Sequence, residues 1–355
     1  MKGNIIMKAV VVNAPGDIRI MEIEKPKPGP REVLARVKHC GVCATDLSIA
    51  SGTLTLGDEE GMQPHYPVRI GHEWSGIIEE VGSETWRLRP GDRIISDTGY
   101  SCGECEMCLE GEYQNCENGR AIGTTGNCWP GAMAEYMLIP ERLAFRVPDN
   151  VSLEEAALVE PSSIGFFGLL RAPLRPGKTL LVVGTGAIGL GGMACAKGVG
   201  IGKTMLAGRK DSKLEIGRTM GADVLINTTK QDMLEAVMKE TNGKGADIVM
   251  DTTGDGSIFN TVMQCVRSSG FLVIPGFYEK PLEHVLLDNL IARNCTLVGA
   301  AGTANMGRRL LDMLSHGHMR LAPMITDRCK LEDVPELMKD IRKVGPQRIK
   351  LMVSI

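Results

Sequence analysis

Apolar runs and amphipathic stretches alternate along the second half of the chain. Short runs that are apolar on both faces are typical of parallel strands covered by helices on each side. The pattern predicts strands at Thr179–Val183, Thr204–Ala207, Val224–Ile226, Ile248–Met250 and Phe271–Ile274, and helices at Leu153–Leu170, Lys213–Met220, Gln231–Glu240 and Ile258–Val266. This alternation indicates βαβ units that build an α/β, doubly wound parallel sheet.

The first 150 residues have a different pattern, in which glycines and prolines separate short β-rich runs. These runs are Ala9–Val12, Glu32–Val37, Ser75–Val81, Arg93–Ile95 and Met133–Ile139. After Gly299 we predict a helix at Met306–His316 and a final strand at Lys350–Val353. The sequence pattern of this last segment is like that of the first 150 residues. We therefore expect a mostly β domain beside the parallel sheet.

Composition narrows the class of protein. A chain of 355 residues with 43% hydrophobic and 23% charged residues suits two globular domains. Its net charge of -3 gives no electrostatic reason to expect nucleic acid or an anionic membrane as partner. The uncharged stretch Leu180–Ala196 is interrupted by glycines, and the N-terminus lacks an apolar signal core. We expect a cytoplasmic protein that binds a small molecule.

A glycine-rich loop follows the strand at Thr179–Val183. Its residues are Gly184, Thr185, Gly186, Ala187, Ile188 and Gly189, a G-x-G-x-x-G match that opens a helix. The glycines allow the backbone to approach a pyrophosphate, and the helix N-terminus supplies unpaired N–H groups. A glycine turn that only packs a strand on a helix is the alternative, but the surrounding βαβ pattern favours dinucleotide binding.

The end of the next strand bears on which dinucleotide binds. An NAD site usually has an acidic residue there, whereas this chain reads Gly208, Arg209 and Lys210. Arg209 could pair with a 2′-phosphate, so we expect NADP(H) in preference to NAD(H). Alternatively, Arg209 and Lys210 form a solvated turn and Asp211 binds the ribose.

Four of the eleven cysteines are crowded into fifteen residues. Cys102, Cys105, Cys108 and Cys116 have spacing that lets four thiolates converge on a structural zinc ion. An iron–sulfur cluster is the main rival, although its usual runs are spaced differently. A chance group of free thiols is the remaining alternative.

Three further segments carry possible ligands for a second, open metal site. They contain Cys43, His72 with Glu73, and Glu160. One thiolate, one imidazole and one or two carboxylates would leave a coordination position for water or substrate. Taken singly, Cys43 could be a buried apolar residue, His72-Glu73 a turn and Glu160 a surface acid.

The order of these motifs resembles that of the zinc-dependent medium-chain dehydrogenases, the alcohol dehydrogenase superfamily. The resemblance extends from about Met7 to the C-terminus. It rests on Cys43-x-Thr45-Asp46, Gly71-His72-Glu73, the four cysteines, Gly131–Tyr136 and the glycine loop. It implies a GroES-like β-rich catalytic domain at residues 1–163 and 300–355, which carries both zinc ions, and a Rossmann domain at residues 164–299.

The resemblance also implies roles for individual residues. Cys43, His72 and Glu160 would be catalytic zinc ligands, with Glu73 beside the metal or transiently on it. Glutamate in Val159-Glu160-Pro161 looks like the polyol and threonine dehydrogenase branch. Thr45 would take the substrate proton.

One position departs from the family pattern. Ser48 stands where relatives commonly have the histidine that ends a proton relay, and His39 or His65 could substitute for it. The segment Gly52–Arg69, with Asp58, Glu59 and Glu60, is either a solvated loop or a polar wall of the substrate pocket.

These features predict a dehydrogenase with two zinc ions per chain that oxidises a secondary alcohol of a polyol, sugar or cyclitol with NAD(P). A threonine-type 3-hydroxy amino acid dehydrogenase is the enzymatic alternative. The alternative outside the enzymes is a nucleotide-binding protein that is stabilised by zinc and has no catalytic activity. We expect a homodimer or homotetramer, and reduced thiols at the six cysteines outside the metal sites.

Overall fold

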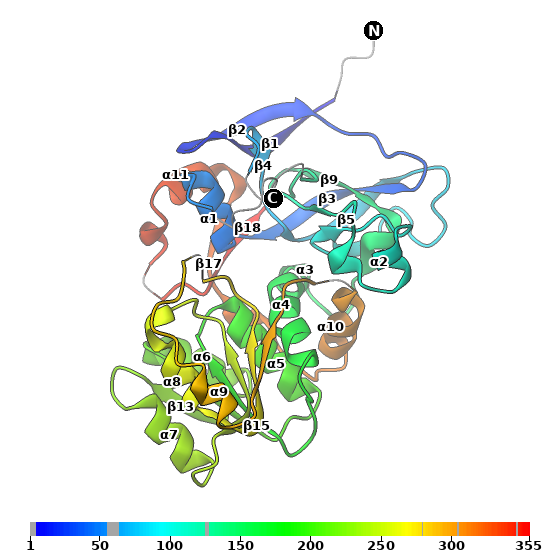
Figure 1. Ribbon diagram of the computed structural model, residues 1–355. Coiled ribbons are helices and arrows are strands. Elements are labelled where there is room, and N and C mark those ends of the chain that lie inside the picture. Colours follow the sequence, from blue (N-terminus) through cyan, green and yellow to red (C-terminus); the bar gives the residue numbers. More distant parts are fainter. Residues whose placement is uncertain (1–4, 55–63, 125–127, 279, 304, 346) are drawn as a thin grey trace. The chain divides into compact units, whose positions relative to one another are not determined.

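The structure, a computed structural model, describes residues 5–54, 64–124, 128–278, 280–303, 305–345 and 347–355 (Figure 1). Asp58, Glu59 and Glu60 of the predicted polar wall lie outside these residues. The chain divides into two compact units. Unit 1 comprises Met1–Glu160, Thr303–Ser315 and Ile325–Ile355, and unit 2 comprises Pro161–Gly302 and His316–Met324.

Unit 2 contains a six-stranded parallel sheet with the strand order β13-β12-β11-β14-β15-β16. The strands are β11 (Thr179–Val183), β12 (Lys203–Gly208), β13 (Val224–Asn227), β14 (Ala246–Asp251), β15 (Val266–Ile274) and β16 (Thr296–Gly299). The helices are α5 (Ala187–Gly198), α6 (Asp211–Thr219), α7 (Met233–Glu240), α8 (Phe259–Gln264) and α9 (Asp288–Ile291). The strand order reverses between β11 and β14, so the prediction of a doubly wound sheet is confirmed.

The predicted helices have different boundaries in the structure, and two of these differences have a clear cause or consequence. The single helix expected over Leu153–Leu170 is wrong, because the chain forms α3 (Leu153–Ala156) and α4 (Val159–Leu170). Pro161 lacks an N–H and its ring would clash with the carbonyl group of Ala157 in a continuous helix. The helix expected to reach Val266 ends at Gln264, and Val266 opens β15.

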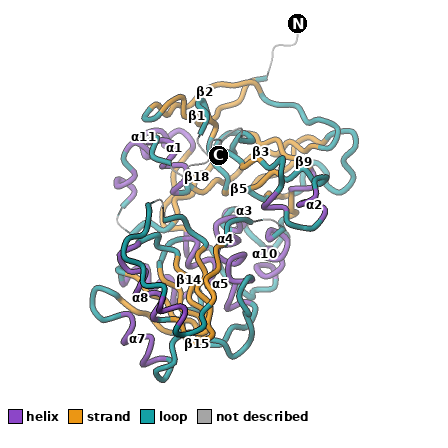
Figure 2. Tube along the Cα trace, viewed as in Figure 1, coloured by secondary structure: helices purple, strands orange, loops and turns teal. Residues whose placement is uncertain are grey.

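Unit 1 is mostly β, as predicted (Figure 2). Its main sheet has the order β10-β6-β5-β3-β18-β17, with β9 also paired to β3. These strands are β3 (Glu32–Gly41), β5 (Glu73–Val81), β6 (Arg93–Ser96), β9 (Tyr136–Pro140), β10 (Ala144–Arg146), β17 (Ile325–Lys330) and β18 (Lys350–Ser354). The strand expected over Met133–Ile139 therefore begins only at Tyr136.

Smaller elements complete unit 1. A three-stranded sheet contains β1 (Ile6–Ala14), β2 (Asp17–Glu24) and β4 (Val68–Arg69), and β7 (Gly99–Tyr100) pairs with β8 (Arg120–Ala121). The helices are α1 (Ala44–Ser51), α2 (Glu106–Leu109), α10 (Met306–Ser315) and α11 (Val334–Lys339). The buried core contains Trp74, Ile78, Ile94, Met133 and Ile139.

Strand pairing brings distant segments together at one end of the main sheet. Gly41, which ends β3, lies opposite Glu73, which begins β5, and also opposite Met352 of β18. A Cβ atom at Gly41 would lie 2.1 Å from Oε2 of Glu73, so this position accepts only glycine without movement of the carboxylate. The register therefore places the residues after β3, at the start of β5 and in β18 around one point.

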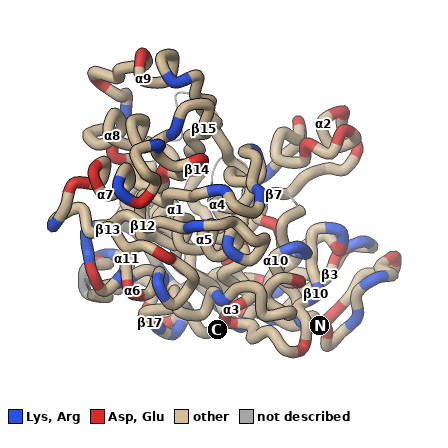
Figure 3. Tube along the Cα trace, turned by 90° about the horizontal axis from the view of Figure 1, so that it is seen from below, with Lys and Arg blue, Asp and Glu red and all other residues tan. Residues whose placement is uncertain are grey.

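Two whole-chain properties agree with the composition. Among the described residues, no helix combines the length and the apolar character needed to cross a membrane. Lys and Arg are interspersed with Asp and Glu along the chain (Figure 3).

Candidate metal centres and dinucleotide site

Three of the predicted ligands form a compact buried group. One ligand atom each from Cys43, His72 and Glu73 lie within 4.8 Å of one another. Cys43 is the residue before α1, and its N–H donates to Oδ2 of Asp46 at 2.8 Å. The Asp46 carboxylate also accepts from the N–H of Gly71 at 3.1 Å. Asp46 thus ties the segments that carry Cys43 and His72 to each other.

The polar atoms of this group suit a bound cation. Nδ1 of His72 and Oε2 of Glu73 are buried and make no hydrogen bond in the described part of the chain. Burial would lower the pKa of His72, but the Asp46 carboxylate and the Cys43 sulfur raise it well above its usual value. Thiolate, imidazole and carboxylate are the ligands that zinc prefers. Nδ1 of His72 lies 3.7 Å from Oδ1 of Asp46. The unpartnered Oε2 of Glu73 and the surrounding negative charge therefore fit a zinc ion.

Glu160 lies close to this group but outside it. The compact group contains Cys43, His72 and Glu73, whereas Oε1 of Glu160 accepts a hydrogen bond from Oγ1 of Thr98 at 2.6 Å. Burial and the neighbouring Glu73 raise the pKa of Glu160, and His72 opposes that shift. Thr98 is a contact of the site that the sequence did not indicate.

Lys350 is the second residue that the sequence did not indicate. Its Nζ lies 2.6 Å from Oε1 of Glu73 and donates to the carbonyl group of Val42 at 3.1 Å. The side chains of Lys350 and Glu73 are only 5% and 1% exposed. Burial would lower the pKa of Lys350, but Glu73 and Cys43 raise it, so the side chain remains a cation. A lysine within an apolar closing strand was the available signal.

The predicted proton relay is only partly assembled. The Cys43 thiol lies 3.6 Å from Oγ1 of Thr45, and Ser48 is on the next turn of α1. His39 lies near Glu154 and Arg328, and burial lowers its pKa. His65 is exposed.

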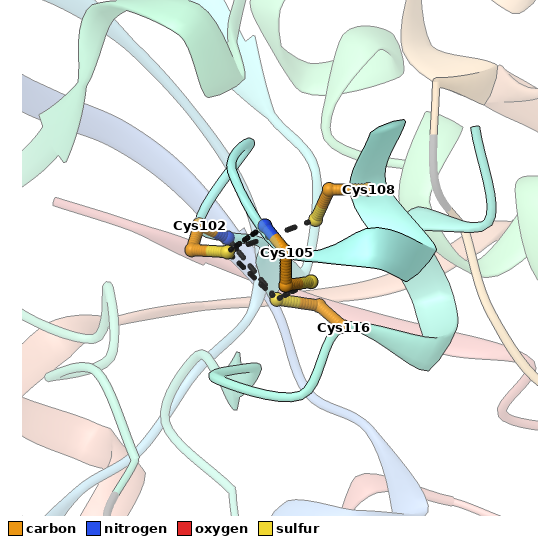
Figure 4. A group of neighbouring side chains, drawn as sticks. All are labelled: Cys102, Cys105, Cys108 and Cys116. Carbon is orange, nitrogen blue, oxygen red and sulfur yellow. Dashed lines mark hydrogen bonds between the residues drawn. The ribbon is translucent and has the colours of Figure 1, made fainter. Parts of the chain in front are cut away.

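The four-cysteine lobe forms the second group (Figure 4). Sγ of Cys102 lies 3.9 Å from that of Cys108 and 3.6 Å from that of Cys116, and the Cys105 and Cys116 sulfurs are 3.8 Å apart. Four sulfurs at about 2.3 Å from a zinc ion are separated by about 3.8 Å. An iron–sulfur cluster attaches its thiolates to different irons and separates them further. The spacing therefore fits one tetrahedral metal ion.

Backbone amides stabilise a thiolate in this lobe. The N–H groups of Glu104 and Cys105 donate to Sγ of Cys102 at 3.4 Å and 3.3 Å. These hydrogen bonds lower the pKa of Cys102 to about 6. A thiol that ionises below neutral pH is ready to bind a metal cation.

The glycine loop has the geometry of a dinucleotide site. Gly184 has φ 114°, and its Cβ would lie 2.4 Å from Oγ1 of Thr252. A Cβ at Gly189 would lie 2.4 Å from the Gly184 carbonyl oxygen, whereas one at Gly186 would meet nothing within 4 Å. The turn is therefore closely packed at Gly184 and Gly189 and has free space at Gly186. Helix α5 begins at the next residue, Ala187. Thr185 and Ile188 complete the loop.

A cavity of about 480 Å³ adjoins this loop within unit 2. Thr185, Gly208 and Arg209 line it, and Lys210 is the residue before α6. Asp211 is already engaged, since it pairs with Lys230 at 2.5 Å and accepts from Asn227 at 2.6 Å. The polar groups beside the cavity therefore include an arginine at the strand end and an aspartate that has other partners.

Comparison with known proteins identifies the family. Residues 29–149 match the family model described as "Alcohol dehydrogenase GroES-like domain", and residues 187–316 match that of "Zinc-binding dehydrogenase". A sorbitol dehydrogenase of Bacillus subtilis is 32% identical, over 98% of this chain and 97% of its own. The chain belongs to the zinc-binding alcohol dehydrogenases.

Two further similar proteins have other names. An L-threonine 3-dehydrogenase of Pyrococcus horikoshii is 29% identical over 96% of each chain. The crystal structure of a putative zinc-binding dehydrogenase from Sinorhizobium meliloti 1021, bound to NADP, superposes with a TM-score of 0.89. It is 27% identical and covers 99% of this chain and 100% of its own.

The predictions of family, fold class and reaction class are confirmed. This alcohol dehydrogenase is an oxidoreductase that acts on a CH–OH group of a small hydroxylated molecule and uses zinc and a nucleotide cofactor.

Proposed function

We propose that the enzyme oxidises a secondary alcohol of a polyol, sugar or cyclitol to the ketone, with Cys43, His72 and Glu160 as catalytic zinc ligands and Glu73 beside the metal. The supporting observation is the buried group of Cys43, His72 and Glu73, in which Oε2 of Glu73 has no hydrogen-bond partner among the described residues. The sorbitol dehydrogenase relative supports the substrate class. The four cysteines Cys102, Cys105, Cys108 and Cys116 would hold a second, structural zinc ion.

The residues of the centre divide the chemistry between them. Zinc, when bound, acts as a Lewis acid that lowers the pKa of the substrate hydroxyl group. Thr45 receives the hydroxyl proton and passes it on, and Ser48 continues the path. Lys350 holds one oxygen of Glu73, and the other oxygen has no hydrogen-bond partner among the described residues. The glycine loop Gly184–Gly189 would hold the nicotinamide dinucleotide, which would supply the acceptor for a hydride and its two electrons from the alcohol carbon.

Loss of a ligand tests this proposal. Cys43→Ser and His72→Ala should reduce kcat at least 1,000-fold while dinucleotide binding, followed by fluorescence titration, stays within about twofold. Cys329→Ser, a thiol outside both groups, is the matched control. Metal analysis should give two zinc ions per chain. Retained turnover in Cys43→Ser would refute the zinc mechanism, and one zinc ion without turnover would favour the noncatalytic nucleotide-binding protein.

NADP(H) is the proposed cofactor. Arg209 lines the cavity at the end of β12, and the engagement of Asp211 with Lys230 supports phosphate binding over ribose binding there. Hydrogen bonds to charged groups contribute about 1.5–3 kcal/mol, so Arg209→Ala should lower the NADP-to-NAD ratio of kcat/KM by about 10- to 100-fold. An unchanged ratio would refute the assignment to Arg209.

The threonine-type activity remains the second candidate, because the Pyrococcus relative is named for it. A panel of polyols, inositols, sugars and L-threonine, assayed by the absorbance of reduced cofactor with both dinucleotides, separates the two. Oxidation of threonine in preference to every polyol would replace the first proposal with the second.

We also propose a homodimer or homotetramer in the cytoplasm. Edge strand β16 leaves Leu297 45% exposed, and Leu286, Leu287 and Ile291 of unit 2 are more exposed still. Unpaired strand edges with apolar side chains favour pairing with another chain. Light scattering that gives a monomer mass would contradict the assembly.

Unit 1 would be the catalytic domain and unit 2 the dinucleotide-binding domain, close to the expected division at residues 1–163, 164–299 and 300–355.

A further inference from the structure

The Thr98 hydroxyl group holds a carboxylate that is proposed as a zinc ligand. Its Oγ1 donates to Oε1 of Glu160 at 2.6 Å, a length typical of an O–H group bonded to a carboxylate. Glu160 is buried in the first turn of α4 and belongs to unit 1, as Thr98 does. Carboxylates that ligate a metal ion are usually oriented by such hydrogen bonds, and loss of the partner weakens metal binding about 10- to 100-fold. Thr98 is therefore placed to orient Glu160.

The backbone of Thr98 is held by hydrogen bonds of its own. Its N–H donates to Oγ1 of Thr303 at 3.4 Å, and its carbonyl group accepts from the N–H of Ile122 at 2.9 Å. The preceding residue, Asp97, accepts from the N–H of Asn305 at 3.0 Å. Because three separate segments hold this part of the chain, the Thr98 hydroxyl group has a defined position.

Thr98 lies at the base of the four-cysteine lobe. It immediately precedes β7, which pairs with β8, and the loop between these two strands carries all four cysteines (Figure 4). Cys102 follows β7 and Cys116 precedes β8, and the N–H of Cys102 donates to Sγ of Cys116 at 3.2 Å. Ile122, which binds the Thr98 carbonyl group, follows β8. The hairpin of β7 and β8 therefore connects the sulfur ligands directly to Thr98.

The other arm of the hairpin contacts the segment of a second proposed zinc ligand. A Cβ atom at Gly123 would lie 2.9 Å from the carbonyl oxygen and 3.0 Å from the nitrogen of Gly71, so the two backbones are in contact. Gly71 immediately precedes His72. The residues on both sides of the hairpin thus contact segments of the catalytic centre, one at Glu160 and the other beside His72.

We propose that Thr98 is a positioning residue for Glu160, and that a metal ion in the four-cysteine lobe strengthens metal binding at the catalytic centre through Thr98. An ion in the lobe would join sulfurs from both arms of the hairpin and so order its strands. Without that ion, metal binding at the catalytic centre would also have to order the hairpin, which would lower its affinity. This inference rests on the proposed function, in which Glu160 is a catalytic zinc ligand, and adds that the structural ion regulates the catalytic one.

Metal affinity tests the role of Thr98 separately from turnover. A chelator is titrated into the cobalt(II)-exchanged enzyme, in which the site with four thiolates absorbs more strongly than the site with one. Thr98→Val should weaken cobalt binding at the catalytic centre about 10- to 100-fold, whereas Thr98→Ser, which retains the hydroxyl group, should stay within about threefold of the wild type. Thr85→Val is the matched control, because the Thr85 hydroxyl group donates to the Gly82 carbonyl group at 2.7 Å, outside both metal groups. Equal affinity of Thr98→Val and the wild type, or equal weakening by Thr98→Ser and Thr98→Val, would overturn the role of Thr98.

Cys108→Ser tests the coupling between the two metal sites. It should remove the ion of the lobe and weaken cobalt binding at the catalytic centre about 10-fold. Because both changes act through Thr98, the double variant with Thr98→Val should bind catalytic cobalt within about twofold of Thr98→Val alone. Unchanged catalytic affinity in Cys108→Ser, or effects that multiply in the double variant, would overturn the coupling.

The reciprocal measurement leaves the lobe intact, so it decides the question even if Cys108→Ser does not fold. Coupling of two binding sites acts equally in both directions, so the lobe of Cys43→Ser should bind cobalt about 10-fold more weakly than that of the wild type. Equal lobe affinity would overturn the coupling. A wild type that binds one metal ion per chain would refute the proposed function and this inference together. Two bound ions whose affinities do not respond to these variants would overturn this inference alone.

Discussion

Replacement of Asp247 should measurably weaken the sheet that carries the glycine loop. Its carboxylate accepts hydrogen bonds from Nζ of Lys178, from Arg267, and from both the N–H and Oγ1 of Thr179, all at 2.8–2.9 Å. Burial would raise its pKa, but these donors lower it from 3.8 to about 2. At about 1.4 kcal/mol per pH unit, the carboxylate contributes about 2 kcal/mol to stability at neutral pH.

The sign of the effect fixes its pH dependence. Because the folded pKa is depressed, the contribution is complete above the unfolded pKa of about 4 and is lost as the pH falls from about 4 to 2. Urea denaturation should show Asp247→Asn about 2 kcal/mol less stable than the wild type at pH 7, with a smaller difference below pH 4. Asp17→Asn, which removes an exposed ion pair with Arg19, should cost less than about 0.5 kcal/mol. Equal free energies of unfolding for Asp247→Asn and the wild type at pH 7 would refute this reasoning. A stability difference at pH 3 as large as that at pH 7 would also refute it.

Three other substitutions probe the metal centres. Lys350→Met leaves the buried Glu73 carboxylate without its cation, so it should lower the free energy of unfolding of the zinc-depleted enzyme by about 3 kcal/mol in urea denaturation. An unchanged urea midpoint would show that the pair contributes nothing to stability. Gly41→Ala places a Cβ against Glu73 and should lower kcat at least 10-fold with an unchanged circular dichroism spectrum; wild-type kcat would contradict the steric argument. Cys108→Ser should remove one zinc ion per chain by metal analysis and lower the melting temperature, while two retained ions would exclude Cys108 as a ligand.

The parallel sheet was the most predictable part of the fold. Strands such as β11 are buried on both faces, so they appear as short apolar runs that local pattern detects. Helix α1 was not predicted, because its eight residues have little amphipathic character and its first turn is fixed by Asp46, whose carboxylate also binds Gly71. Local sequence carries no record of such a tertiary contact.

The candidate site, too, was predictable where local motifs indicated its residues and unpredictable where tertiary contacts added others. The motifs located Cys43, His72 and Glu73, but Lys350 reaches Glu73 from 277 residues away through the pairing of β18 with β3. Thr98 reaches Glu160 from a separate segment.

The place of β18 in the main sheet has a consequence for how the protein is made. β18 lies between β3 and β17, and it supplies the cation that holds Glu73. A ribosome synthesises the proposed cysteine and histidine ligands within the first 116 residues, yet the buried pair of Lys350 and Glu73 cannot form until residue 350 has emerged. The parallel sheet of unit 2 is complete in sequence by Gly299, so it can fold while the catalytic centre still lacks its last strand. Maturation of the catalytic centre is therefore expected to follow translation of β18.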